Sequence, residues 1–143
     1  MSYEEKGVWV FLTIAVTGYA VYLFLVLPQL LAGTTVGDID WVTPMLWTIG
    51  GAIVAGIVGR ILVEIVSPSD STKGDIRDKE IDRLGERVGN SFIVIGGVGA
   101  LVLAMFDVDA FWIANALYLG FVSASVLSGV TKLIAYRKGV PTW

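Results

Sequence analysis

Long runs of hydrophobic residues alternate with short polar stretches along this chain. Three runs contain no Asp, Glu, Lys or Arg: 8–37, 45–59 and 91–106. A membrane-spanning helix needs about 20 predominantly apolar residues, so runs of this length are typical of transmembrane segments. The pattern predicts four transmembrane helices, at about residues 8–31, 45–66, 88–106 and 110–136.

Helix-breaking residues support these limits. Pro28 falls in the last turn of the first predicted helix, and Pro44 lies just ahead of the second, where proline suits a first turn. The run Ser67-Pro68-Ser69-Asp70-Ser71 ends the second helix. We therefore expect one all-α domain over residues 1–143, a four-helix membrane bundle with a polar segment at 67–87.

The distribution of basic residues predicts the orientation. In a four-span arrangement, nine Lys and Arg residues fall on one side: Lys6, Lys73, Arg77, Lys79, Arg83, Arg87, Lys132, Arg137 and Lys138. The other side carries only acidic residues: Asp38, Asp40, Asp107 and Asp109. Because Lys and Arg are enriched in cytoplasmic loops, both termini are expected inside the cell. The chain is then expected to be a multi-pass membrane protein, with segment 67–87 in the cytoplasm.

Composition narrows the chemistry. Hydrophobic residues make up 55% of the chain and charged residues 16%, against about 25% charged in a typical soluble domain. The chain has no cysteine and no histidine, which excludes disulfides, thiolate or histidine metal sites and Cys/His/Ser catalytic sets. No catalytic constellation is visible, so we expect a protein that is not an enzyme and needs no cofactor.

Two charged residues lie clearly inside a predicted span. Arg60 and Glu64 are one turn apart on the second helix, so they share a face and can pair. Charges within the bilayer are costly and indicate function by default, but a long Arg side chain can also reach the headgroups. Two interpretations stay open: an interfacial anchor, or a polar site inside the bundle with the polar residues of the fourth helix, Asn115, Tyr118 and Ser128.

Small residues recur every four positions on three predicted helices. The second carries Gly51, Ala55 and Gly59, the third Gly96, Ala100 and Ala104, and the fourth Ala116, Gly120, Ala124 and Ser128. Such stripes let helix backbones approach closely in lipid. They predict either packing within one chain or a contact between copies in a homo-oligomer.

The polar segment before the third span is expected to be an amphipathic helix. Ile81, Leu84 and Val88 recur at helical spacing, and Asp75 is a suitable N-cap. Residues 70–87 hold six acidic and five basic residues, which disfavours a nucleic-acid site or a polybasic lipid site. We expect this helix to run into the third span. Two interpretations stay open: a solvated connector between the second and third spans, or a docking helix that contacts either the bundle or a cytoplasmic protein. The candidate contact residues are Asp78, Ile81, Asp82, Leu84 and Arg87.

Four stretches of the sequence carry a resemblance to a known group of proteins. They are Tyr3-Glu4-Glu5-Lys6-Gly7, Gly59-Arg60-Ile61-Leu62-Val63-Glu64-Ile65, Asp78-Lys79-Glu80-Ile81-Asp82-Arg83-Leu84-Gly85-Glu86 and Phe111-Trp112-Ile113-Ala114-Asn115. The chain resembles short four-span bacterial integral membrane proteins that have no assigned activity. The resemblance covers nearly the whole chain. It implies the four-span topology and a location in a bacterial plasma membrane, but no reaction.

These observations favour a small membrane protein without enzymatic activity. We expect it to lie in the lipid bilayer, to form homo-oligomers and to offer the cytoplasmic helix to a protein partner. The alternative is an ion or small-solute transporter or channel, with a polar path that involves Arg60, Glu64 and the polar residues of the fourth helix.

Overall fold

The computed structural model describes residues 2–66 and 76–141. Within these ranges the protein is helical, with a short 3-10 turn, η1 (Val36–Asp38), between the first two helices. The α-helices are α1 (Tyr3–Leu31), α2 (Val42–Val66), α3 (Ile76–Met105) and α4 (Ala110–Lys138). Each of these four is long and apolar enough to cross a membrane, as the hydrophobic pattern predicted.

Local hydrogen bonds explain where the helices begin. The Ser2 hydroxyl accepts a bond of 3.1 Å from the Glu5 amide, so α1 begins at Tyr3, ahead of the predicted start at residue 8. The Asp109 carboxylate caps α4 through the Phe111 amide at 3.0 Å. Helix α3 is continuous from Ile76 to Met105, so the polar residues 76–87 and the apolar stretch that follows them form one helix, as the helical spacing predicted. The expected N-cap, Asp75, lies outside the described residues.

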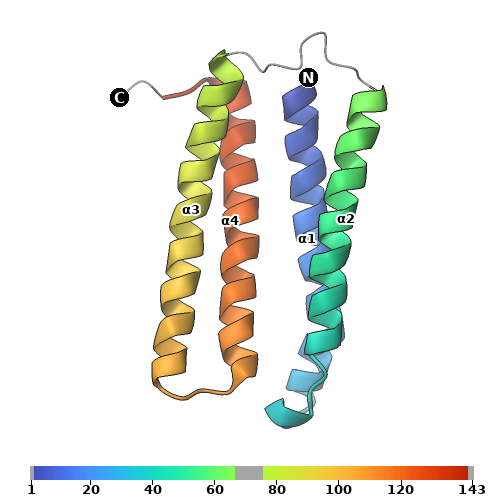
Figure 1. Ribbon diagram of the computed structural model, residues 1–143, viewed down its shortest axis with the longest axis vertical. Coiled ribbons are helices and arrows are strands. Elements are labelled where there is room, and N and C mark those ends of the chain that lie inside the picture. The colour runs from blue at the N-terminus through green and yellow to red at the C-terminus, as the bar shows by residue number, and fades with distance from the viewer. Residues whose placement is uncertain (1, 67–75, 142–143) are drawn as a thin grey trace.

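The helices form an open row in the order α3, α4, α1, α2 (Figure 1). Helix α3 packs mainly on α4, α4 on α1, and α1 on α2, whereas α2 and α3 are not packed against each other. The expected bundle is therefore open along one side. Both chain ends lie at the same end of the row as the start of α3 (Figure 1).

Small residues bring the backbones of α3 and α4 close together. A Cβ atom on Gly96 would lie 2.8 Å from the Cα of Gly120, and one on Gly120 would lie 2.9 Å from the Cα of Gly96. Two further contacts extend this seam: a Cβ on Gly89 would lie 3.2 Å from the Ala124 carbonyl, and one on Gly96 lies 3.6 Å from the Ala116 carbonyl. The small residues of α4 thus pack within the chain.

The stripe on α2 is divided between two environments. A Cβ on Gly59 would meet the side chain of Val10 on α1 at 2.7 Å, so Gly59 permits close packing of α1 and α2. Nothing lies within 4 Å of the Cβ position of Gly51, and Ala55 is exposed. A contact between copies at these two residues stays a prediction.

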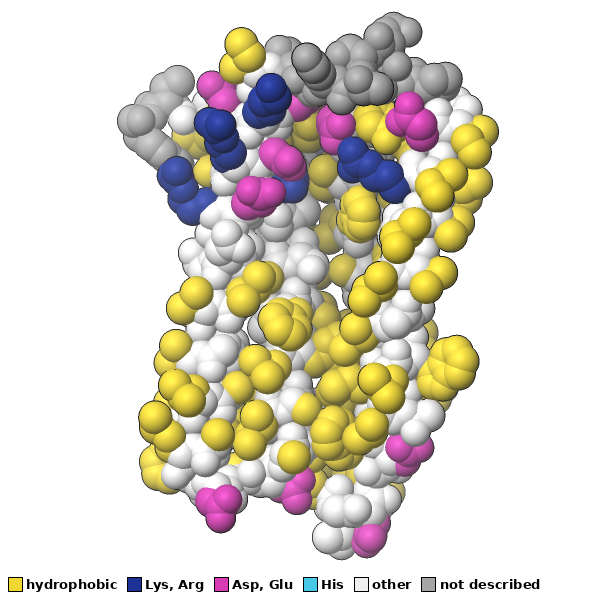
Figure 2. All heavy atoms as spheres, in the orientation of Figure 1, with side chains coloured by type: hydrophobic (Ala, Val, Ile, Leu, Met, Phe, Trp, Pro, Cys, Tyr) yellow, Lys and Arg dark blue, Asp and Glu magenta, His cyan; other side chains and the backbone are white. Residues whose placement is uncertain are grey.

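Charged side chains are sorted along the long axis. On the face drawn in Figure 2, Lys and Arg gather at the end that holds the termini, and the opposite end shows acidic groups alone. The sequence predicted this separation. It follows from the helix directions, because the α1–α2 and α3–α4 connections that carry the Asp residues lie at one end (Figure 1). We call the end with the termini the basic end.

Candidate functional site

The first turns of α3 are fixed onto the end of α4. Asp82 accepts a bond from Lys132 Nζ at 2.6 Å, and Asp78 accepts one from the Tyr136 hydroxyl at 3.0 Å. Arg77 donates to the Tyr136 carbonyl at 2.8 Å. Ile81, on the same face, has no exposed surface. Of the two docking surfaces that the sequence left open, the bundle is the one that Asp78, Ile81 and Asp82 contact.

A glycine allows Lys132 to lie along α3. A Cβ atom on Gly85 would come within 2.5 Å of Lys132 Cε and 2.6 Å of its Cγ. The aliphatic part of Lys132 therefore occupies the space that a larger residue at 85 would fill, and its amine reaches Asp82. Gly85 is one turn beyond Ile81 on the face that meets α4.

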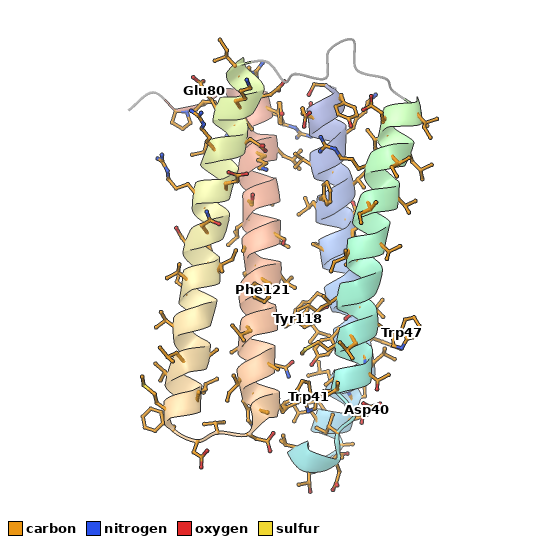
Figure 3. The ribbon with its side chains drawn as sticks, in the orientation of Figure 1. Asp40, Trp41, Trp47, Glu80, Tyr118 and Phe121 are labelled. Atoms are coloured by element: carbon orange, nitrogen blue, oxygen red, sulfur yellow. The ribbon has the colours of Figure 1, made fainter. Side chains whose placement is uncertain are left out.

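The opposite face of this helix segment is exposed and carries mixed charge. Its exposed residues are Lys79, Glu80, Arg83, Glu86 and Arg87. Figure 3 labels Glu80, which lies on this face near the start of α3. Leu84 is half-buried. Among the predicted contact residues, Arg87 is thus the one that belongs to this charged face.

Arg60 pairs with a different residue from the one expected. Its guanidinium lies 3.6 Å from Glu4 on α1 and 5.4 Å from the centre of the Tyr3 ring. The predicted partner, Glu64, lies near the Tyr3 hydroxyl instead. Since α1 begins earlier than predicted, it brings Glu4 to the level of Arg60. The Arg60 and Glu4 side chains are 48% and 34% exposed, so this pair contributes less than about 1 kcal/mol.

A tyrosine cluster lies towards the other end of the molecule. The fully buried Tyr22 donates to the Asn115 side-chain oxygen at 2.6 Å, and Asn115 donates to the Phe111 carbonyl at 2.7 Å. The hydroxyls of Thr48 and Tyr118 are 2.9 Å apart. Tyr118 points from α4 towards the α1–α2 pair in Figure 3. These hydrogen bonds join α4 to both α1 and α2.

A groove runs between α1, α2 and α4, and Figure 2 shows it as the hollow down the middle of the molecule. Its volume is about 860 Å³, and its lining is mainly apolar. Three of the predicted polar-site residues line it, Arg60, Tyr118 and Ser128, whereas Glu64 and Asn115 do not. Thr48 is twelve residues from Arg60 along α2, or about 18 Å, so the two polar groups lie near opposite ends of this space.

The chain matches no protein-family model, no curated protein and no solved structure. Among the described residues, no group of three or more acidic side chains is arranged to hold a metal ion. The site is therefore interpreted from its own geometry, which offers a charged helix face and a lateral groove.

Four residues that matter for this geometry were not singled out in the sequence. Glu4 and Gly85 lie in polar stretches, where nothing marks them as contact residues. Tyr22 and Thr48 are polar groups within apolar runs. Their partners, Asn115 and Tyr118, are on α4, which is distant in sequence. Polar residues at similar depths on different predicted spans are the signal that could have paired them.

Proposed function

We propose that this chain is a non-enzymatic multi-pass protein of a bacterial plasma membrane that presents the start of α3 to a cytoplasmic protein. The main support is the fixed position of this segment, in which Ile81 is fully buried against the bundle. A helix that is already ordered loses little conformational freedom on binding, which favours association.

The charge of the exposed face indicates the kind of partner. Lys79, Arg83 and Arg87 alternate with Glu80 and Glu86 over two to three turns. A face with both signs suits a protein surface with a complementary charge pattern, because wrong partners then meet like charges. It is a poor match for nucleic acid, which favours a uniformly basic surface.

The alternative, transport, has less support. Arg60, Tyr118 and Ser128 share one groove, but an ion path requires polar groups along its whole length. The lining is mainly apolar, and the groove reaches Tyr118, which is bonded to Thr48. The Asn115 side chain already accepts a hydrogen bond from Tyr22 and donates one to the Phe111 carbonyl. These contacts favour a structural role for the tyrosine cluster.

The orientation is tested by cysteine labelling, since the native chain contains no cysteine. Thr35→Cys and Glu80→Cys place single thiols at exposed positions towards opposite ends of the molecule. In intact cells we expect an impermeant maleimide to label Thr35→Cys, and to label Glu80→Cys after permeabilisation. Labelling of Glu80→Cys in intact cells would contradict the proposed topology.

The partner surface is tested by photo-crosslinking in cells. A photoreactive residue at Glu80 or Arg83 should give a discrete protein adduct, whereas the same residue at the exposed Arg137 on α4 serves as the control. In the protein with the photoreactive residue at position 80, the double substitution Arg83→Glu/Arg87→Glu should lower the yield of the adduct by about tenfold or more, because like charges at an interface cost several kcal/mol. Crosslinks to lipid alone from both Glu80 and Arg83 would contradict the proposal.

A further inference from the structure

The lateral groove has walls from two helices that do not otherwise pack closely. Helix α1 forms its base, and α2 and α4 form its sides. Side chains such as Phe11, Ile53 and Phe121 give it an apolar surface. In a membrane, a space of this kind is filled by something hydrophobic, and its shape and charge indicate which molecule fits.

The groove is closed towards the end of the molecule opposite the basic end. The Thr48 and Tyr118 hydroxyls, 2.9 Å apart, connect its two walls. Tyr19 on the base meets Tyr118 edge to face, with ring centres 5.2 Å apart. A chain that enters from the basic end therefore meets this tyrosine cluster and stops there.

At the basic end the groove carries positive charge. Among the described residues that line it, the charged ones are Arg60 on α2 and Lys132 on α4, one on each wall. Each already has a carboxylate partner, Glu4 at 3.6 Å and Asp82 at 2.6 Å. A guanidinium has five N–H donors and an ammonium has three, so one carboxylate contact leaves each cation with donors for a further anionic oxygen.

The length of the groove matches one half of a bilayer. Tyr118 and Lys132 are fourteen residues apart on α4, or about 21 Å, and Ile49 and Ile61 are twelve apart on α2, or about 18 Å. One leaflet contributes about 15 Å of hydrocarbon, so a groove of this length would place cations at its open end at the headgroup level. The volume of about 860 Å³ falls in the range of ligand sites, about 300–1,000 Å³.

We propose that this groove binds a phospholipid with an anionic headgroup, taken from the leaflet at the basic end. One acyl chain lies in the groove and ends at the tyrosine cluster, and the phosphate contacts Arg60 and Lys132. The inference rests on the proposed membrane location, but it does not depend on the protein partner of α3.

The test is native mass spectrometry of the purified full chain in detergent. Dioleoyl phosphatidylglycerol and dioleoyl phosphatidylcholine are added in separate titrations. The native protein should retain one phosphatidylglycerol at concentrations where phosphatidylcholine is lost. The double variant Arg60→Gln/Lys132→Gln should lose at least about tenfold in apparent affinity for phosphatidylglycerol, since two cations at the headgroup are removed.

Two further variants locate the bound lipid. Ser125→Phe adds bulk at an exposed residue that lines the groove and leaves both cations in place, so it should also weaken retention about tenfold. Arg87→Gln is the matched control: Arg87 is eighteen residues from Met105 on α3, as Arg60 is from Val42 on α2, but it does not line the groove. It should change retention less than about twofold.

Three outcomes would overturn the proposal. Equal retention of the two lipids would mean that lipid associates without selection for the headgroup. Unchanged binding in Ser125→Phe would place the lipid elsewhere. A lipid-free dimer in which Ser125→Cys forms a disulfide between copies would make a second chain the occupant. Because the assay contains no cytoplasmic protein, its failure is distinguishable from failure of the α3 crosslinking experiment.

Discussion

Gly96→Ala is expected to destabilise the protein strongly, although it adds a single methyl group. The added Cβ would lie 2.8 Å from the Cα of Gly120, so α3 and α4 must separate. Backbone cannot move aside as a side-chain end does, and overpacking of this kind costs about 1–3 kcal/mol. The loss should lie at the upper end of that range, because close helix packing is a main source of stability in lipid. Unfolding of purified protein in mixed micelles by added SDS measures it.

The neighbouring glycine provides the control. Gly97 has nothing within 4 Å of its Cβ position, and alanine is a better helix former than glycine by up to about 1 kcal/mol. Gly97→Ala should therefore leave stability unchanged or raise it. Similar losses in the two variants would show that the Gly96–Gly120 approach does not limit the packing of α3 on α4.

Ile81→Ala should release the start of α3 from α4. Ile81 is fully buried, and truncation of a buried isoleucine to alanine costs about 2–5 kcal/mol. Because Ile81 lies near the beginning of α3, the loss is expected to appear as local opening of residues 76–87 rather than as global unfolding. Amide hydrogen exchange in this segment should accelerate by about thirtyfold or more, since every 1.4 kcal/mol or so is a factor of ten.

The same helix contains the matched control for this substitution. Ile76 is 75% exposed, so Ile76→Ala should change exchange in residues 77–87 by less than about twofold. Exchange at the rate of a free peptide in the native protein would show that the segment is not held on α4. That result would also remove the main support for a preformed recognition surface.

The sequence predicts the four helices well because membrane insertion depends on local composition. Charge-free runs of sufficient length fix the position of each span without any knowledge of its neighbours. The predicted start of α1, residue 8, was wrong because Ser2 caps the helix, and a hydropathy pattern does not detect a cap. The continuity of α3 was predictable because Ile81, Leu84 and Val88 keep helical spacing into the apolar run.

The contacts between helices were harder to predict, because a periodic pattern shows which face is apolar but not which helix meets it. The i,i+4 rule favoured Glu64 as the partner of Arg60, yet Glu4 from α1 forms the ion pair. The polar residues of α4 were recognised as unusual, but Tyr22 and Thr48 were not identified as their partners. The groove was not predictable, since it depends on α2 and α4 standing apart.

The order of the helices in the row has a consequence for biogenesis. Helices α1 and α2 are consecutive and pack together, as are α3 and α4. Each hairpin can therefore complete its own packing when its second helix leaves the ribosome. The halves then meet mainly where α4 packs on α1, and they are joined by the bonds from Tyr22 on α1 to Asn115 and from Thr48 on α2 to Tyr118. Unpaired polar groups are costly in hydrocarbon, so these bonds favour the association of the two folded hairpins.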